Sequence, residues 1–576
     1  MKTLITLQWL FIAILSVALP LAARAAAAWP EPLTTSQPDG TTLTLLLHGD
    51  EFYNYATTTD GYTLLQRKTD KAWVYAEPTG SRGALRPGDI IAHNLNNRTA
   101  REKSFIARTD NHLIDRPALI KGNEARSERD YRAKSGGRPF DFSRFRGLVI
   151  LVEFNDCRFS RKDMKNFYNR IFNEADYTGF ANPDGSPNPD GKCTGSVRDY
   201  FHDNSGGQFT PQFDVYGPFT VNNYSVNSFG SFELARNIFN DLLKQINGKI
   251  DCSRYDNDNN GYIDAIFFVV AGTAASSSPD RSHLWPHQWT LNGIEFGGKR
   301  AGRYACSTEF DSGKIGTIGT ICHEFSHVLG LPDLYDRDDK HPDIKPYAPG
   351  RWDIMATGCY NNSARTPAGY SLYDRYALGF VTPKVITSPG EYTLNPIGYK
   401  GEGYILTSPN EGEKFLIENR QQSTKWDKYV PGNGMIIARM DSTDASCWRN
   451  MAPNSDRTHY RYELLNNVDG SSNRKATLFP GEKNITVVTN SSTPCLKTFD
   501  GKPNDFVLTD IAMRRGVITF TVRNATWENS HGMGRSLRNF AKPPKRNNSR
   551  TPNTRNNPNT RNNRSLPSIR IPFKKK

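Results

Sequence analysis

Residues 323–333, His323-Glu-Phe-Ser-His327-Val-Leu-Gly330-Leu-Pro-Asp333, decide both the fold class and the chemistry expected of this chain. Positions four apart lie on one face of an α-helix, so the imidazoles of His323 and His327 can reach the same metal ion. Gly330 can adopt the left-handed conformation that ends a helix, and the proline two residues later prevents the helix from resuming. The chain then turns back and brings Asp333 toward the ion. This stretch therefore predicts a helix with two metal ligands, followed by a turn that supplies a third.

Glu324 lies on the same helix, too close to His323 to be an easy ligand but well placed beside a metal-bound water. A carboxylate in that place can act as a general base. Three protein ligands leave one position of Zn²⁺ open for water or substrate, as catalytic zinc requires. Asp336, three residues after Asp333, is the alternative third ligand. A surface helix with two unrelated histidines is the alternative interpretation, and the apolar stretch 316–322 argues against it.

Two residues beyond the helix extend the predicted site. Met355 lies within Gly-Arg-Trp-Asp-Ile-Met-Ala-Thr-Gly, residues 350–358, where a tight turn can carry it beneath the metal. Tyr360 follows five residues later and is a candidate oxyanion donor. Substrate is expected to lie as an extended strand along an edge of a sheet, and residues 303–308 are one candidate for that edge.

The string His-Glu-x-x-His-x-x-Gly-x-x-Asp, followed by a methionine turn, resembles the metzincin clan of zinc peptidases. Residues 323–336, HEFSHVLGLPDLYD, resemble the immune inhibitor A family of secreted bacterial metallopeptidases. The likeness extends to further segments and covers about residues 30–523; these segments are 146–154, 196–209, 284–287, 415–421 and 433–441. The last of them departs from the family, which tends to have Trp-His where this chain has Ala438-Arg439.

This resemblance implies Zn²⁺ bound by His323, His327 and Asp333, with Glu324 as the catalytic residue. It implies protein or peptide substrates and a propeptide before residue 140 that is removed on activation. The expected function is therefore that of a secreted zinc-dependent endopeptidase made as a zymogen. A binding protein on an inactive peptidase scaffold and a zinc hydrolase of non-peptide amides are the alternatives. An intact Glu324 argues against the first, and only the family likeness argues against the second.

The strand and helix patterns predict an α+β fold, with a metzincin-like α/β catalytic domain between two β-rich parts. Residues 1–25 have the basic start, apolar run and Ala-Arg-Ala end of a bacterial signal peptide, which predicts a secreted, extracellular protein. An uncleaved anchor is the alternative, but the apolar run is shorter than the ~20 residues that span a bilayer. The other predicted parts are a β-rich propeptide at 26–134, the catalytic domain at 140–384, a β-rich module at 385–523 and a disordered basic tail at 524–576.

The charged, aperiodic segment 124–137 predicts an exposed linker that a processing protease can cut at one of its basic residues. The first 156 residues contain no cysteine, which excludes a thiolate that blocks the zinc. A propeptide carboxylate from Asp39, Asp50 or Asp60 can fill the open metal position instead. Simple steric blockage and a permanent accessory domain are the alternatives.

Charge and cysteine content restrict the classes of partner. The net charge is +14, but residues 531–576 carry thirteen Lys or Arg and no acid, so the rest of the chain is close to neutral. Specific nucleic-acid binding is therefore not expected of the folded part, while the tail can bind anionic surfaces. The eight cysteines form no Cys-x-x-Cys pair, and in an exported protein they favour disulfide bonds over metal binding.

Two further patterns concern metals. Residues 256–264, Asp-Asn-Asp-Asn-Asn-Gly-Tyr-Ile-Asp, place oxygen ligands as in a calcium loop, but the twelfth position is Phe267, which excludes a complete EF-hand. Ca²⁺ is thus a candidate second cofactor, with a further ligand such as Asp251 and a plain Asn/Asp turn as the alternative; the candidate ligands are Asp256, Asp258, Asn260, Tyr262 and Asp264. His283 and His287 are also four apart, but Pro286 forbids the helix that would align them, so a loop lining the cleft is expected there.

Overall fold

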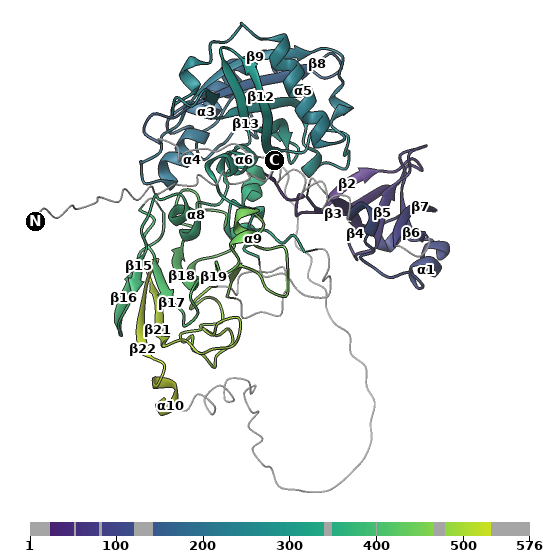
Figure 1. Ribbon diagram of the computed structural model, residues 1–576. Coiled ribbons are helices and arrows are strands. Elements are labelled where there is room, and N and C mark those ends of the chain that lie inside the picture. The colour runs from purple at the N-terminus through teal and green to yellow at the C-terminus, as the bar shows by residue number, and fades with distance from the viewer. Residues whose placement is uncertain are drawn as a thin grey trace, which may run out of the picture. The chain divides into compact units, whose positions relative to one another are not determined.

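The computed structural model describes residues 24–50, 53–79, 83–119, 142–338, 348–398, 400–465 and 478–531 (Figure 1). Nearly all of the predicted signal peptide, the linker 124–137 and the tail from residue 532 onward lie outside these residues. The described part of the chain contains both helices and strands, which confirms the predicted α+β class. Within these residues, no helix is long and apolar enough to cross a membrane.

The sheet at the centre of the predicted catalytic segment has the strand order β1-β12-β13-β11-β8-β9. β8 lies parallel to β9 and β11, and β11 lies parallel to β13, whereas β12 is antiparallel to β13 and pairs on its other side with the short β1. Two short strands, β10 and β14, also pair with β13. The bounds are β1 Arg24–Ala25, β8 Arg146–Phe154, β9 Gln212–Val221, β10 Tyr262–Ile263, β11 Ile266–Thr273, β12 His287–Phe296, β13 Lys299–Asp311 and β14 Lys314–Ile315.

Both faces of this sheet are covered, because its strands are apolar on both sides. Along β8, Leu148, Ile150 and Val152 belong to one buried cluster and Val149 and Leu151 to the other. α5 (Phe232–Gln245) lies on the first face, while α3 (Met164–Asn173), α4 (Val197–Asn204) and α6 (Gly319–Leu329) lie on the second. Strands buried on both faces are typical of parallel sheets. The predicted helix that carries His323 and His327 is thereby confirmed as α6.

The β-rich C-terminal part consists of two sheets. The first has the order β15-β17-β18-β19-β20 and the second the order β16-β22-β21. Their bounds are β15 Lys384–Ile386, β16 Gly390–Leu394, β17 Tyr404–Thr407, β18 Glu413–Arg420, β19 Gly434–Asp441, β20 Tyr462–Leu464, β21 Phe506–Arg514 and β22 Val517–Asn524. Phe415 and Ile417 of β18 face the core between the two sheets, but Leu416 belongs to the same cluster as α4 and α6. The C-terminal part therefore shares a hydrophobic core with the segment that contains α4 and α6.

The N-terminal part is a six-stranded antiparallel meander in sequence order, β2 Leu33–Ser36, β3 Thr42–Gly49, β4 Asn54–Thr58, β5 Thr63–Gln66, β6 Trp73–Thr79 and β7 Ala84–Ile91. The Asp39-Gly40 and Asp60-Gly61 pairs lie in the β2–β3 and β4–β5 turns, where both glycines have positive φ. α1 (Ala100–Ile106) begins with a capping box between Thr99 and Glu102.

The start of the predicted tail is ordered. β22 continues to Asn524, and α10 (Trp527–His531) follows it. The prediction that the tail begins at residue 524 is therefore several residues too early, because the pairing of β22 with β21 includes Asn524 opposite Phe506.

Candidate metal centre

The local sequence around α6 explains where this helix begins and ends. At its start, a Cβ on Gly319 would lie 1.9 Å from the carbonyl oxygen of Cys359, so only glycine permits this close packing. At its end, Gly330 has φ 118° and its N–H bonds to the carbonyls of Ser326 and His327. Glycine at this position is the left-handed cap that the sequence predicts.

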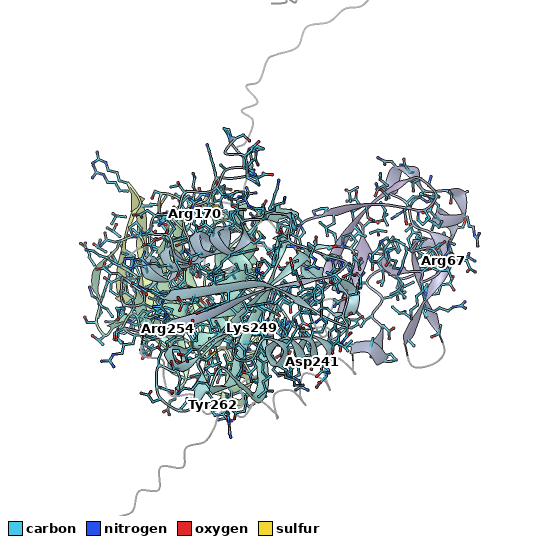
Figure 2. The ribbon with its side chains drawn as sticks, turned by 90° about the horizontal axis from the view of Figure 1, so that it is seen from above. Arg67, Arg170, Asp241, Lys249, Arg254 and Tyr262 are labelled. Carbon is cyan, nitrogen blue, oxygen red and sulfur yellow. The ribbon has the colours of Figure 1, made fainter. Side chains whose placement is uncertain are left out.

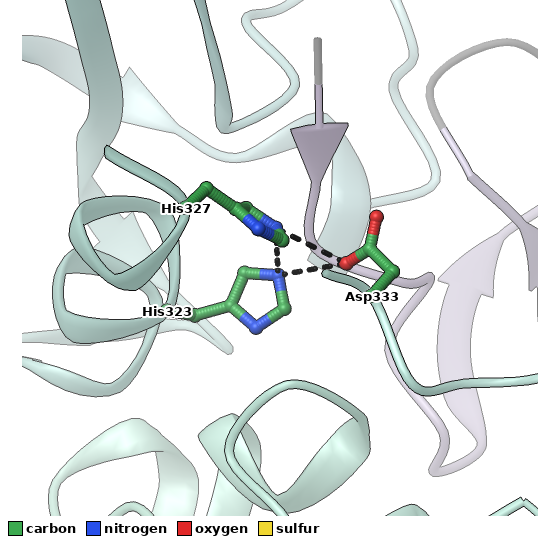
Figure 3. A group of neighbouring side chains, drawn as sticks. All are labelled: His323, His327 and Asp333. Carbon is green, nitrogen blue, oxygen red and sulfur yellow. Dashed lines mark hydrogen bonds and ion pairs between the residues drawn. The ribbon is translucent and has the colours of Figure 1, made fainter. Parts of the chain in front are cut away.

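The structure brings His323, His327 and Asp333 together in one buried group (Figure 3). The two Nε2 atoms are 3.1 Å apart, and Oδ1 of Asp333 lies 3.4 Å from Nε2 of His323 and 3.1 Å from Nε2 of His327. Ring atoms Nδ1 of His323 and His327 lie 2.7 and 2.8 Å from the carbonyl oxygens of Ile354 and Leu331. In each ring, Nδ1–H donates to a backbone carbonyl, so the lone pair of Nε2 faces Asp333. This arrangement is typical of zinc-binding histidines.

The electrostatics of Asp333 suit a metal ligand. Burial raises the pKa of its carboxyl, but the two histidines that face it and the charge of Arg337 together lower that pKa below its usual value. Within the described residues, neither of its oxygens is satisfied by a conventional hydrogen bond. An ionised carboxylate and two imidazole nitrogens that converge in a buried group form a donor set that fits Zn²⁺.

Asp336, the alternative third ligand, points elsewhere. Its Oδ2 accepts hydrogen bonds from the Arg457 guanidinium at 2.5 and 3.0 Å. The turn after Gly330 carries Asp333 back to the histidines, whereas Asp336 lies on the next part of the loop. The structure therefore favours Asp333 over Asp336.

The Met355 turn supports the group from below. The Met355 N–H donates to Asp353 at 2.8 Å, and the Met355 carbonyl accepts from the Leu334 N–H at 2.7 Å. Since Leu334 follows Asp333 and Ile354 bonds to His323, this single turn holds both the loop of the third ligand and the ring of the first. Met355 itself is fully buried in the core beside α6.

Glu324 and Tyr360 both contact the N-terminal stretch of the chain. Oε1 of Glu324 accepts the Ala26 N–H at 2.8 Å, the Tyr360 hydroxyl donates to the Ala27 carbonyl at 2.7 Å, and Trp285 Nε1 donates to the Ala26 carbonyl at 2.8 Å. Just before these residues, β1 pairs antiparallel with His287 and Gln288 of β12. Residues 24–27 therefore run along the sheet edge and past the metal group (Figure 3).

This path corrects the predicted substrate edge. Residues 303–308 belong to β13, which lies inside the sheet between β12 and β11. The edge beside the metal group is β12 instead. The Gly297-Gly298 pair is the signal that could have revealed the β12–β13 hairpin, which covers the edge of the parallel strands.

Arg337 is a residue that the sequence analysis missed. It is buried, and its Nη1 lies 3.6 Å from Oδ2 of Asp333 while its Nε lies 3.6 Å from Oδ2 of Asp50. The other two candidate carboxylates of the predicted propeptide pair with neighbouring residues, Asp39 with His93 at 2.9 Å and Asp60 with Arg98 at 2.6 Å. None of the three joins the metal group, so the structure does not support a propeptide carboxylate as the blocking ligand.

The candidate calcium residues form a loop that is held by hydrogen bonds. Asp256 accepts the N–H groups of Asn260 and Gly261 and pairs with Lys299 at 2.6 Å. Asp258 accepts from Asn260, Asp264 accepts from Asn257, and Asp251 accepts from Ser253; Tyr262 begins β10 at the surface (Figure 2). The ammonium of Lys299 supplies the positive charge at this loop, and Ca²⁺ binding stays a prediction.

The remaining predicted features have simple structural roles. His287 is buried between Trp285 O and Tyr304 Oη, each at 2.7 Å, whereas His283 lies 3.9 Å from Asp280, so the two histidines share no site. All eight cysteines are free thiols, so the expected disulfide bonds are not found. Several are buried in the core, where they pack as small apolar side chains.

The fold and this group define a class: an α/β domain with a helix-borne metal site of the kind that metallopeptidases use. Residues 143–378 match the family model described as immune inhibitor A peptidase M6, catalytic domain. A curated relative, "Immune inhibitor A" of Bacillus thuringiensis subsp. alesti, is 25% identical over 263 residues, which cover 39% of this chain and 38% of that protein. The resemblance predicted from the sequence is thereby confirmed over the catalytic segment. Likeness outside it stays a prediction, and the chain spans less than half of that relative.

Proposed function

We propose that this chain is a secreted, zinc-dependent endopeptidase made as a zymogen. The observation that carries the proposal is the convergence of His323, His327 and Asp333 beside Glu324, on a segment that matches a metallopeptidase catalytic domain. Two imidazoles and one carboxylate leave a coordination position free, which favours a catalytic over a structural zinc.

Zinc, when bound, supplies the Lewis acid that acidifies a water and polarises the scissile carbonyl. The Glu324 carboxylate accepts the Ala26 N–H. A water in the place of that N–H can give its proton to Glu324, which can return the proton to the leaving amine. The Tyr360 hydroxyl, which donates to the Ala27 carbonyl, is placed to donate to a substrate carbonyl in the same way. His323 and His327 keep their tautomers through the Ile354 and Leu331 carbonyls.

The substrate path follows from β1. A peptide that replaces residues 24–27 can pair with His287 and Gln288 on the free edge of β12. Main-chain pairing of this kind binds extended peptides with little regard to sequence, which suits a protease of unfolded or extended protein segments. Protein substrates are therefore favoured over small amides, because a small amide has no extended main chain that could pair with β12.

The same contacts support latency. Ala26, Ala27 and Ala28 are buried, and Ala26 lies against the catalytic carboxylate, so the N-terminal stretch fills the place that a substrate needs. Cleavage of the predicted signal peptide after Ala25 would leave the new amino group of Ala26 next to Glu324. Steric blockage by this stretch thus explains a zymogen without a thiolate or carboxylate on the metal, and proteolysis in 124–137 would release the propeptide.

The test is hydrolysis of casein by the processed protein, before and after removal of metal with a chelator. We expect cleavage to stop on chelation and to return on addition of stoichiometric Zn²⁺, and the unprocessed chain to cleave far more slowly. Cleavage that persists without metal would refute the proposal. Zinc binding without any cleavage would favour the inactive binding protein, and hydrolysis of small amides alone would favour the non-peptide hydrolase.

A further inference from the structure

Beneath the Met355 turn, the structure buries four acidic side chains around a single paired cation. Asp353, Asp374, Glu418 and Asp427 are each at most 5% exposed. Arg420 pairs with Glu418 at 3.2 Å and with Asp427 through two bonds of 2.6 and 3.1 Å. Within the described residues, neither Asp353 nor Asp374 forms an ion pair. Burying two ionised carboxylates without a counter-ion is strongly unfavourable.

Asp353 and Asp374 each have one satisfied oxygen. Oδ1 of Asp353 accepts the Met355 N–H at 2.8 Å, and Oδ2 of Asp374 accepts the Ser371 N–H at 3.0 Å at the start of α8 (Leu372–Ala377). The other oxygen of each, Oδ2 of Asp353 and Oδ1 of Asp374, has no conventional hydrogen-bond partner among the described residues, although the Ser371 hydroxyl lies close enough to both carboxyls to lower their pKa values. The two carboxyl groups nevertheless lie within hydrogen-bond reach of each other. Two acceptors that face each other repel unless a proton lies between them.

The physical environment favours retention of that proton. Burial raises the pKa of Asp374 well above its usual value, and the nearby charge of Asp353 raises it further. Burial also raises the pKa of Asp353. A hydrogen bond between a carboxylic acid and a carboxylate is short and strong in a medium of low polarity.

We propose that Asp353 and Asp374 share one proton, and that the resulting carboxyl–carboxylate hydrogen bond positions His323 through the Met355 turn. The path has three links: Asp374 holds Asp353, Asp353 fixes the turn through the Met355 N–H, and the Ile354 carbonyl within that turn fixes Nδ1 of His323. Asp353 and Asp374 are positioning residues, since neither touches the metal group. This role deepens the proposed function and rests on it.

The C-terminal part anchors the far end of this path. Glu418 of β18 accepts the Leu372 N–H at the first turn of α8, and Arg420 of the same strand donates to the Gly369 carbonyl at 3.0 Å. Hydrogen-bond partners behind a metal ligand typically change metal affinity by ten- to a hundredfold when they are removed. The β-rich part thus reaches the metal site through α8 and the acid pair.

Asparagine substitutions test the shared proton directly. In Asp374→Asn the amide oxygen still accepts from Ser371 and the NH₂ group donates to Asp353; in Asp353→Asn the oxygen accepts from Met355 and the NH₂ group donates to Asp374. Each single variant therefore replaces the shared proton with an amide proton. In the double variant two NH₂ groups face each other, and the bond is lost.

The readouts are thermal unfolding and zinc affinity in competition with a chelator, both measured on the full chain. We expect each single variant to keep its Tm within a few degrees and its affinity within about threefold, while the double variant loses tenfold or more in affinity, far beyond the sum of the singles. Asp163→Asn with Asp184→Asn, in more exposed turns of the same domain, is the matched control and should be additive. A double variant that does not fold agrees with the proposal as long as both singles fold. Additive effects of the two substitutions, or single variants that do not fold, would overturn the proposal. Single variants that are more stable than wild type would also overturn it, because that gain would show two repelling charges in wild type.

The pH dependence gives a second readout. The folded-state pKa of Asp374 is raised, so the stability from this bond is present at low pH and lost as the pH rises through that pKa. We expect this loss of stability with rising pH to be absent from Asp374→Asn; an unchanged loss in the variant would contradict the shared proton. The other ionisable groups that face the pair, Glu418, Arg420, Asp427, Tyr200, Tyr370, Arg375 and Tyr462, are common to both proteins. Neither readout requires peptidase activity, so a failed casein assay would leave this test intact.

Discussion

At the scale of single residues, the candidate metal ligands could be predicted from the sequence, but the residue that contacts the third ligand, Arg337, could not. The four-residue spacing of His323 and His327 fixes their common face, and Gly330 fixes the turn that returns Asp333. Arg337 carries no such periodic information, because its partner Asp50 is distant in sequence. Contacts between residues far apart in the chain depend on how the domains pack, which a local pattern does not encode.

Arg337 provides a prediction at this scale. Its guanidinium lies 3.6 Å from the carboxylate of Asp333, so Arg337→Gln removes the charge that holds this ligand in its ionised form and orientation. We expect zinc affinity to fall about tenfold or more, measured by competition with a chelator. Arg457→Gln, which removes the partner of Asp336 instead, is the control and should leave zinc affinity unchanged. Equal losses in both variants would show that the effect is not specific to Asp333.

At the scale of elements, the two histidines and Gly330 predicted α6 and its C-terminal end correctly. The edge of the sheet was predicted wrongly, since β12 covers β13 through a hairpin that turns at Gly297-Gly298, a signal that the prediction did not use. The β1 strand could not be predicted at all, because its two residues lie at the end of the predicted signal peptide and have no strand pattern of their own. Its formation depends on the free edge of β12.

β3 carries a prediction about acid. His48 is half-buried on this strand beside Thr57, and its desolvation, with the charges of His112 and Arg281, lowers its pKa to about 4. Because the folded-state pKa lies below the unfolded value, stability is present above about pH 6.5 and is lost as the pH falls toward 4. We expect the unprocessed chain to lose up to about 3 kcal/mol of unfolding free energy over this range in urea titrations, at 1.36 kcal/mol per unit of pKa shift. In His48→Gln this slope should be shallower, and an identical slope would rule out His48 as its cause.

At the scale of the whole molecule, composition separated the basic tail from the folded part, and the strand patterns located the three β-rich and α/β regions. The predicted border at residue 384 hides a shared core: Leu416, Ile436 and Tyr462 pack into the cluster that contains α6 and Met355. The residue pattern along β18 and β19 indicates that both faces of each strand are buried, but it does not show which part of the chain covers each face. The shared core could therefore not be predicted from the sequence.

Truncation tests the shared core. A chain that ends at residue 384 exposes the apolar face that β18 and β19 cover and loses Glu418 and Arg420 below α8. We expect this product to be insoluble or to lack a cooperative unfolding transition, whereas a chain that ends at residue 531 should unfold as the full chain does. Calorimetry distinguishes the two, and a cooperative, zinc-binding product ending at 384 would contradict a common core.

The most direct measurement of the central claim is the activity and metal content of processed Glu324→Gln. Because this change leaves His323, His327 and Asp333 in place, the variant should bind one zinc per chain, as wild type does. Its rate of casein cleavage should fall about 10²- to 10⁴-fold, since the group that moves the proton is gone. Undiminished cleavage by the zinc-loaded variant, or a wild-type protein that is active with no zinc bound, would contradict the account.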